Sequence, residues 1–304
     1  MTQTLPALKD PPSAISAETS RLVFHVSPLS NKGLLSQQVR DALKALLRDT
    51  HGATIVKLRA FVAGSGDMRR VSTIVSETFT EHKLALPALS TIEVGALALE
   101  GSQVVIESIA LDKKTVNPDG LAFYSAQPIA KLHPLTGTLR ATCFLSSFDA
   151  LAKMRPEVEK AFAGAEVNFV QSQRMGFEAS DECEAVVRLD HAPAQPVGIE
   201  NGAAMVNTPK IVLTGTQMAF RDTDADLRLA FERLQKALEP LGVSYKDVFW
   251  SSAYPLTRPV EGKVRAMEQE FFDRAKPPAG TMLLFEGLPS LDATMALDVM
   301  AAEK

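Results

Sequence analysis

Side chains that could carry out acid–base, nucleophilic or metal chemistry occur throughout the chain, but their spacing matches no familiar catalytic motif. The histidines are far apart and lack the spacing of metal ligands; they are His25, His51, His82, His133 and His191. No serine, histidine and aspartate group into a triad by spacing, and no glycine-rich phosphate-binding loop is complete. The sequence therefore predicts neither a metal nor a cofactor.

The two cysteines, Cys143 and Cys183, are too few for a disulfide framework in a chain of 304 residues. Cys143 lies within an apolar run, residues 140–148, where we expect a strand and an inert, buried thiol. Both cysteines fit a reducing compartment. The first residues show no cationic segment followed by an apolar one, so they do not read as a signal peptide. We therefore expect a cytoplasmic protein.

The composition favours a globular protein with an ordinary core. Hydrophobic residues make up 46% of the chain and charged residues 22%. The formal net charge of -4 gives no electrostatic indication of nucleic-acid binding. No apolar stretch approaches the roughly 20 residues that a membrane-spanning helix needs. We therefore expect no nucleic-acid partner and no membrane partner.

The elements that position the candidate side chains repeat along the sequence. In residues 210–304, apolar residues recur every three or four positions between Asp222 and Leu241, which predicts a helix. Strands are predicted before and after this helix, a second helix follows, and two final strands are expected at 281–288 and 293–302. The order is β-α-β-α-β-β, and residues 21–113 show the same order.

The middle of the chain, residues 120–192, is a shorter copy. Its opening strand ends near Gln127, which corresponds to Gln217 in the last copy. The first long helix is missing, whereas a strand, the second helix and two closing strands are predicted. Residues 193–209 are expected to form a linker. Residues 1–20, which contain three prolines and little periodicity, are expected to form a loose N-terminal arm.

Two segments, 87–110 and 277–302, resemble the C-terminal signature of the RidA/YjgF family, and residues 236–259 resemble the family's passage from helix through glycine to strand. The resemblance implies an α/β chain of three tandem RidA-like modules. It further implies an intrachain pseudo-trimer with mixed sheets around a central barrel, and ligand clefts between the modules. The expected assembly is a monomer or a homodimer of pseudo-trimers. The expected partner is a small-molecule ligand.

The resemblance also indicates which catalytic side chains are absent. Active members of the family use an arginine to hold the substrate carboxylate, a role that suits its planar, two-pronged guanidinium group. The matching positions here are Leu89 and Gly280. The family's first glutamate, which helps to position water, is replaced by Val105 and Ala296. We therefore expect the usual arginine-dependent imine deaminase chemistry to be lost.

Five residues remain as ligand-binding candidates. Glu107 and Asp298 keep the family's second acidic position, and Arg188 aligns with it in the middle copy. Arg188 either binds an anion in a cleft or pairs with an acid such as Glu107 or Asp298. Gln127 and Gln217 stand where the family has a Ser-Gly-Gln turn, and they either line a cleft or form hydrogen bonds within the turn.

Two classes of function follow from these residues and from the resemblance. The first is a small-molecule-binding protein with a repurposed hydrolase- or lyase-type site in one inter-module cleft, acting on a small polar carbonyl, imine or enamine compound. The alternative is a non-catalytic binding or interaction scaffold. A chorismatase-like enzyme is less favoured, because chorismatases keep a glutamate that residues 295–298 lack. An enzyme should show a cleft with converging polar groups and a shifted pKa, whereas a scaffold should show closed or apolar clefts.

Overall fold

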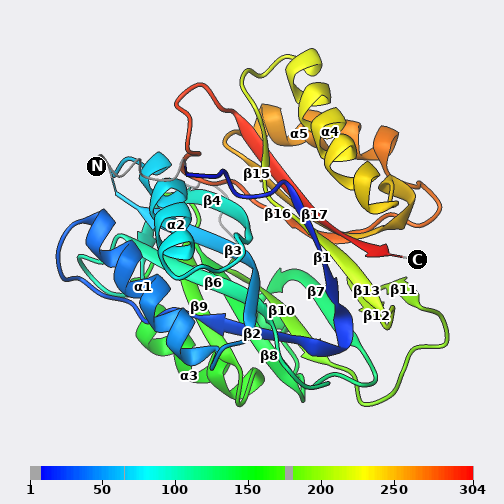
Figure 1. The fold of residues 1–304 in the computed structure, drawn as a ribbon, viewed down its shortest axis with the longest axis horizontal. Coiled ribbons are helices and arrows are strands. Elements are labelled where there is room, and N and C mark those ends of the chain that lie inside the picture. The colour runs from blue at the N-terminus through cyan, green and yellow to red at the C-terminus, as the bar shows by residue number, and fades with distance from the viewer. Residues whose placement is uncertain (1–7, 65, 175–180, 304) are drawn as a thin grey trace, which may run out of the picture.

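The computed structural model describes residues 8–64, 66–174 and 181–303, which fold into three mixed β-sheets with helices on their outer sides (Figure 1). Each sheet contains one parallel strand pair, and its other pairs are antiparallel. The prediction of a mixed α/β fold is confirmed. Among the described strands, every sheet is open and none closes into a barrel.

The first sheet has the strand order β2-β6-β3-β4. Its strands are β2 (Leu22–Val26), β3 (Thr54–Ala63), β4 (Ala88–Val94) and β6 (Val104–Leu111). Helices α1 (Leu35–Asp49) and α2 (Arg69–Glu81) cover one face of this sheet. Val39, Leu43 and Leu46 are fully buried in the core between helices and sheet, as their spacing of three and four residues predicts.

The third sheet repeats this arrangement with the strand order β1-β13-β17-β15-β16, and β14 also pairs with β17. Its strands from the last copy are β13 (Lys210–Thr214), β14 (Gln217–Ala219), β15 (Val248–Pro255), β16 (Ala279–Met282) and β17 (Met295–Glu303). Its helices are α4 (Asp224–Leu238) and α5 (Arg258–Phe271). The side chain of Thr223 caps α4 by accepting a hydrogen bond from the Asp226 N–H. The strand predicted at 281–288 is wrong in its bounds, because β16 ends at Met282.

The second sheet has the order β11-β12-β7-β10-β8-β9-β5 and carries one helix, α3 (Leu151–Ala161). Its strands from the middle copy are β7 (Leu121–Pro128), β8 (Thr138–Leu145), β9 (Glu166–Gln171) and β10 (Glu182–Arg188). Only a short 3-10 turn, Ile129–Lys131, stands between β7 and β8, where the first and third sheets have the long helices α1 and α4. Strand β5 (Ala96–Leu97), which lies between β4 and β6 in the sequence, belongs to this second sheet because it pairs with β9.

Two segments that were expected to be irregular form strands. Residues 193–209 contain the hairpin of β11 (Val197–Glu200) and β12 (Ala203–Val206), and β12 pairs with β7. In the N-terminal arm, β1 (Ala14–Glu18) pairs with β13, while residues 1–7 lie outside the described part. The predictions of a linker and a loose arm are therefore wrong at these strands. Both segments pair with the edge of a neighbouring strand, whose backbone groups would otherwise lack partners.

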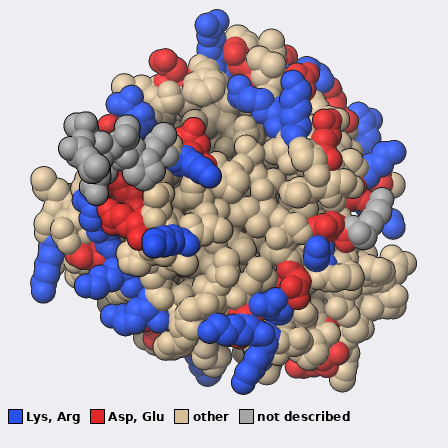
Figure 2. Space-filling view, viewed as in Figure 1, with Lys and Arg blue, Asp and Glu red and all other residues tan. Residues whose placement is uncertain are grey.

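Apolar side chains from all three sheets meet on their inner faces. One cluster contains Phe24, Phe123 and Phe249 of the first, second and third sheets, and the rings of Phe123 and Phe249 lie 5.4 Å apart. Burying aromatic side chains of this size stabilises the packing of sheet on sheet by about 1.5–3 kcal/mol each. No helix in the described ranges is long and apolar enough to cross a membrane. Figure 2 shows positive and negative side chains interspersed around one face, with a mostly uncharged surface at its centre.

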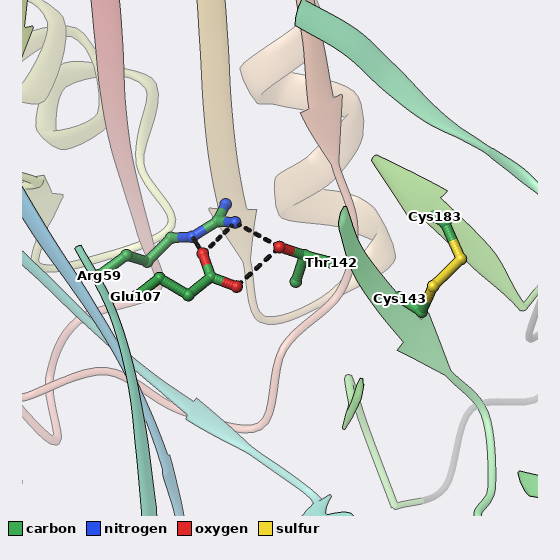
Figure 3. Close-up of a disulfide and its surroundings, with 5 residues drawn as sticks. All are labelled: Arg59, Glu107, Thr142, Cys143 and Cys183. Carbon is green, nitrogen blue, oxygen red and sulfur yellow. Dashed lines mark hydrogen bonds and ion pairs between the residues drawn. A yellow bond between two sulfur atoms is a disulfide. The ribbon is translucent and has the colours of Figure 1, made fainter. Parts of the chain in front are cut away.

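The two cysteines correct the prediction of a free thiol. Cys143 of β8 and Cys183 of β10 lie directly opposite each other in the antiparallel register, and they are joined by a disulfide (Figure 3). The pairing follows from the strand register, because facing residues of neighbouring strands bring their side chains within bonding reach. The cytoplasmic location was argued partly from free thiols, so that support is removed and the location stays a prediction.

Candidate functional site

A cleft with a volume of about 1150 Å³ lies between the second and third sheets. One wall comes from the second sheet and the segment after β9, through Ala126, Ser172, Gln173 and Glu182. The opposite wall comes from α5, from strands β15 and β16, and from the segment that joins α5 to β16. Its polar side chains are Ser251, Arg258, Glu261, Arg265, Glu268, Gln269, Asp273, Arg274 and Thr281.

Two hydrogen bonds connect β7 to β16 beside this cleft. The backbone N–H of Gly280 donates to Ser125 Oγ at 2.9 Å, and the N–H of Ala126 donates to Thr281 Oγ1 at 3.2 Å. A Cβ atom on Gly280 would lie 2.0 Å from the carbonyl oxygen of Ser251. Position 280 therefore has no room for any side chain while these strands keep their spacing.

Glu268 is the titratable group that this cleft perturbs most clearly. Its carboxyl group lies on α5 and accepts a hydrogen bond from Ser251 Oγ at 3.2 Å. Burial raises the pKa of Glu268 to about 7, and the Ser251 hydroxyl and the nearby Arg265 oppose this rise without cancelling it. A carboxyl group with a pKa near neutrality can both accept and donate a proton at ordinary pH.

Glu261 lies on the same helix in a different electrostatic environment. Arg258 and Arg265 each donate a hydrogen bond to its carboxylate at 2.7 Å. Burial opposes ionisation, but these two hydrogen bonds and charges prevail and lower the pKa of Glu261. One helix thus presents two acids whose pKa values are moved in opposite directions, an arrangement that in enzymes separates a proton-transferring group from a permanently charged one.

A second, much smaller cavity of about 30 Å³ lies where the three sheets meet. The Glu107 carboxylate accepts two hydrogen bonds from Arg59, at 2.9 and 2.7 Å, and one from Thr142 at 2.7 Å (Figure 3). Asn168 donates another at 2.8 Å, and Arg140 lies 3.6 Å away. Burial would raise the pKa of Glu107, but the positive charges of Arg59 and Arg140 and these hydrogen bonds hold it at about 2.

Asp298 lines the same small cavity. Its carboxylate accepts hydrogen bonds from Ser90 at 2.6 Å and Tyr254 at 3.3 Å, and Lys57 Nζ lies 3.4 Å away. A volume of about 30 Å³ is that of a single water molecule. Glu107 and Asp298, which the sequence offered as ligand-binding candidates, are therefore partners in internal ion pairs and lie outside the large cleft.

The family model described as Endoribonuclease L-PSP matches residues 19–112, the segment that forms the first sheet and its helices. Residues 19–112 therefore belong to the RidA/YjgF family. A Mycobacterium tuberculosis member of the YjgF/YER057c/UK114 family is 19% identical over 30% of this chain and 78% of its own, with a TM-score of 0.29. TdcF of E. coli with bound serine is 20% identical over 34% and 94%, with a TM-score of 0.28.

A solved chorismatase is also similar, at 10% identity over 95% of this chain and 77% of its own, with a TM-score of 0.48. No curated protein matches the chain. At these identities and TM-scores, the solved structures support no statement about the activity of this chain.

Strand pairing places an acid at the same position in all three sheets. In each sheet an acid on the closing strand lies opposite a polar residue on the preceding long strand. The pairs are Arg59 with Glu107, Thr142 with Glu184, and Ser252 with Asp298. The acid of the middle copy is therefore Glu184, and the sequence alignment that placed Arg188 there is wrong by four residues. The strand register is continuous from Glu182 to Val186 against β8, and it assigns the position without ambiguity.

The corrected register changes which family positions are retained. Two residues before these acids stand Val105, Glu182 and Ala296, so the middle copy keeps a glutamate at the first acidic position. Glu182 lines the large cleft. At the position of the RidA/YjgF arginine the three sheets carry Leu89, Val167 and Gly280. The arginine is thus absent from all three copies, and Gly280 lines the same cleft as Glu182.

The other candidates from the sequence lie away from the cleft lining. Gln127 on β7 is opposite Cys183, and Gln217 on β14 is opposite Leu297. Arg188, at the end of β10, is exposed, and its Nε donates to Asn117 Oδ1 at 3.2 Å. The alternative in which Arg188 pairs with Glu107 or Asp298 is therefore wrong, since Arg59, Arg140 and Lys57 contact those acids instead.

Sequence reasoning missed Glu182, Ser251 and Glu268. The Glu-Cys-Glu run at 182–184 repeats the Glu-x-Glu spacing of the RidA/YjgF signature and could have identified Glu182. The helical stripe of α5 indicated which of its residues face the core. It did not indicate that Glu268, beside that stripe, would face a second sheet from elsewhere in the chain.

Proposed function

We propose that the chain is a small-molecule hydrolase or lyase whose site is the cleft between the second and third sheets. The observation that carries this proposal is Glu268, a carboxyl group with a pKa of about 7 on the wall of a cleft of about 1150 Å³. The proposed substrates are small polar carbonyl, imine or enamine compounds. Their chemistry requires a proton to be moved on or off nitrogen, oxygen or carbon, which a group of this pKa performs well near neutrality.

In this proposal, the residues of the cleft have separate roles. Glu268 accepts a proton from water or donates one to the leaving atom, and the Ser251 hydroxyl fixes the orientation of its carboxyl group. Glu182, on the opposite wall, is a second acid for holding a polar or cationic substrate group. Glu261 stays ionised and holds Arg258 and Arg265 at the edge of the cleft. The carboxylate clamp of the family is not part of this site, because Gly280 cannot be replaced by arginine without a clash.

We also propose that the three sheets are three tandem modules, residues 21–113, 120–192 and 210–304, arranged as an intrachain pseudo-trimer around a central region. Matched acids at Glu107, Glu184 and Asp298 support this arrangement. The cleft is built by two modules of one chain, so a monomer of 32.8 kDa, or a homodimer of such units, is sufficient for the site. Light scattering that found a homotrimer of chains as the smallest species would contradict it.

Only one of the three equivalent positions is proposed to bind ligand. At the first, the Leu89 carbonyl oxygen accepts a hydrogen bond from the Thr216 N–H at 3.2 Å. Near the second, β9 pairs with β5, with Ala96 opposite Gln171. Inter-module contacts lie at or near all three positions, but of the three residues only Gly280 lines the large cleft. We therefore expect one ligand bound per chain in calorimetry.

Hydrolysis assays on a panel of small imines, enamines and cyclic amides test the proposal. We expect turnover by the full chain near pH 7 and a loss of at least 100-fold in kcat for Glu268→Gln. Glu270→Gln is the matched control, because Glu270 is an exposed acid on the same helix and should leave kcat unchanged. Saturable binding of panel compounds without turnover by the unmodified chain would instead support the non-catalytic scaffold.

A further inference from the structure

The buried charges at the meeting of the three sheets are unequally divided among the sheets. The first sheet contributes two cations, Lys57 and Arg59, and one acid, Glu107. The second contributes one of each, Arg140 and Glu184. The third sheet contributes Asp298 as its only charge at these positions. Trp250 and Ser252 of β15 occupy the positions that correspond to the cations of the other two sheets. Three cations and three acids result, so the cluster as a whole is neutral.

Contacts between sheets satisfy these charges. Lys57 Nζ of the first sheet lies 3.4 Å from Asp298 Oδ2 of the third. Arg59 of the first sheet forms an ion pair with Glu184 of the second. Arg140 of the second sheet lies 3.6 Å from Glu107 of the first. Each acid therefore has a cationic partner on a different sheet, and the surplus cation of the first sheet meets the surplus acid of the third.

We propose that the inner faces of the first and third sheets are charge-matched recognition surfaces: neither can be neutralised by copies of itself, and each is neutralised by the other together with the second sheet. Three copies of the first sheet around one centre would bring six cations against three acids. Three copies of the third sheet would bring three acids with no cation. Buried charges without partners strongly destabilise an assembly. When one copy of each sheet is present, the cations of the first sheet and the acid of the third sheet all have partners of opposite charge.

The apolar contacts around the centre cannot make this distinction. At one matched position the three sheets carry Phe61, Phe144 and Tyr254, which are all large aromatic residues. Such residues drive any of the sheets to pack with any other, because apolar burial is non-directional. Specificity must come from a feature that differs between the sheets, and the charges at the matched positions differ. This inference does not depend on the cleft being catalytic.

Charge reversal in the full-length chain tests the recognition surface. The variants are Lys57→Glu, Asp298→Lys and the pair of changes together. Each single change places two like charges in contact, so we expect a Tm lower by about 10 °C and a smaller monomer fraction after refolding. The double variant should regain at least half of the lost Tm. The matched control is Lys210→Glu, which disrupts the exposed pair with Glu303 and should shift Tm by about 1–2 °C.

A milder cycle covers the case in which the reversed singles do not fold. It combines Lys57→Met and Asp298→Asn, which remove charge without reversing it. Asp298→Asn alone leaves Lys57 buried without its carboxylate, so the double variant should be more stable than this single one. Positive coupling in either cycle supports charge matching. Additive losses in both cycles would overturn it, because Lys57 and Asp298 would then act as independent buried groups.

Discussion

Ser251 donates a hydrogen bond to Glu268, with 3.2 Å between Oγ and Oε1, and this contact joins strand β15 to the helix that covers it. The bond holds the carboxyl group at the wall of the large cleft. Because a hydroxyl is a weaker partner than a cation, it does not offset the effect of burial, and the pKa of Glu268 stays near neutrality.

Glu268 should make the free energy of unfolding depend on pH between about 4.5 and 7. Its pKa in the folded protein, about 7, is above the ordinary value of 4.5, so the folded protein binds this proton more tightly than the unfolded chain. Its favourable contribution is fully present below about pH 4.5 and is lost as the pH rises through 7. We expect urea unfolding of Glu268→Gln to lack this loss, which is about 2–3 kcal/mol in the unmodified protein. Parallel pH profiles for the two proteins would contradict the shifted pKa.

Gly280 should tolerate no side chain. Gly280→Ala places a Cβ atom 2.0 Å from the carbonyl oxygen of Ser251, so we expect a loss of about 2–4 kcal/mol and no gain of imine hydrolysis from Gly280→Arg. Gly262→Ala is the matched control. Gly262 lies inside α5 with open space at its Cβ position, so this change should stabilise the helix by up to about 1 kcal/mol. Thermal unfolding of both variants checks the pair, and equal Tm values would contradict the steric argument.

Much of the fold could be predicted because its signals are local. The burial of Val39 and Leu43 in α1 follows from helical spacing, and the cap at Thr223 follows from Asp226 three residues later. The middle copy was harder: the sequence prediction put the acidic position at Arg188, whereas the strand register puts it at Glu184. Strands β1 and β12 were missed because they are stabilised by the edges of distant strands and not by their own pattern.

The candidate site was less predictable, because it depends on how separate sheets face each other. Glu107 and Asp298 were predicted as ligand-binding candidates, but they form internal ion pairs with Arg59 and Lys57, which come from strands about 50 and 240 residues away. The pKa of Glu268 depends on burial by a cleft wall to which the second sheet contributes. No spacing rule relates residues 182 and 268, so only the packed structure identifies them as neighbours of one cleft.

The disulfide between Cys143 and Cys183 should contribute strongly to stability. It closes a loop of 40 residues, for which the entropy of the unfolded chain predicts about 3–4 kcal/mol. We expect no free thiol in the denatured, unreduced protein, and a Tm lower by about 5–6 °C in the double variant Cys143→Ala/Cys183→Ala. Cys143→Ala alone should match the double variant, because either change removes the bond. Two reactive thiols in the purified protein would contradict the pairing and restore the case for a reducing compartment.

Glu107 should govern the stability of the protein in acid. Its pKa in the folded protein is about 2, below the ordinary value of 4.5, so its contribution is present above about pH 4.5 and is lost as the pH falls through 2. Glu107→Gln leaves Arg59 and Arg140 buried beside a neutral amide, and we expect it to lower the free energy of unfolding by about 3–5 kcal/mol at pH 7. The difference in the free energy of unfolding between this variant and the unmodified protein should shrink between pH 4 and 2.

Arg188→Ala, which removes an exposed cation at the end of β10, should change the free energy of unfolding by less than about 1 kcal/mol at every pH. Urea midpoints across this range measure both, and an equal effect of the two substitutions at pH 7 would exclude a special role for the buried cluster.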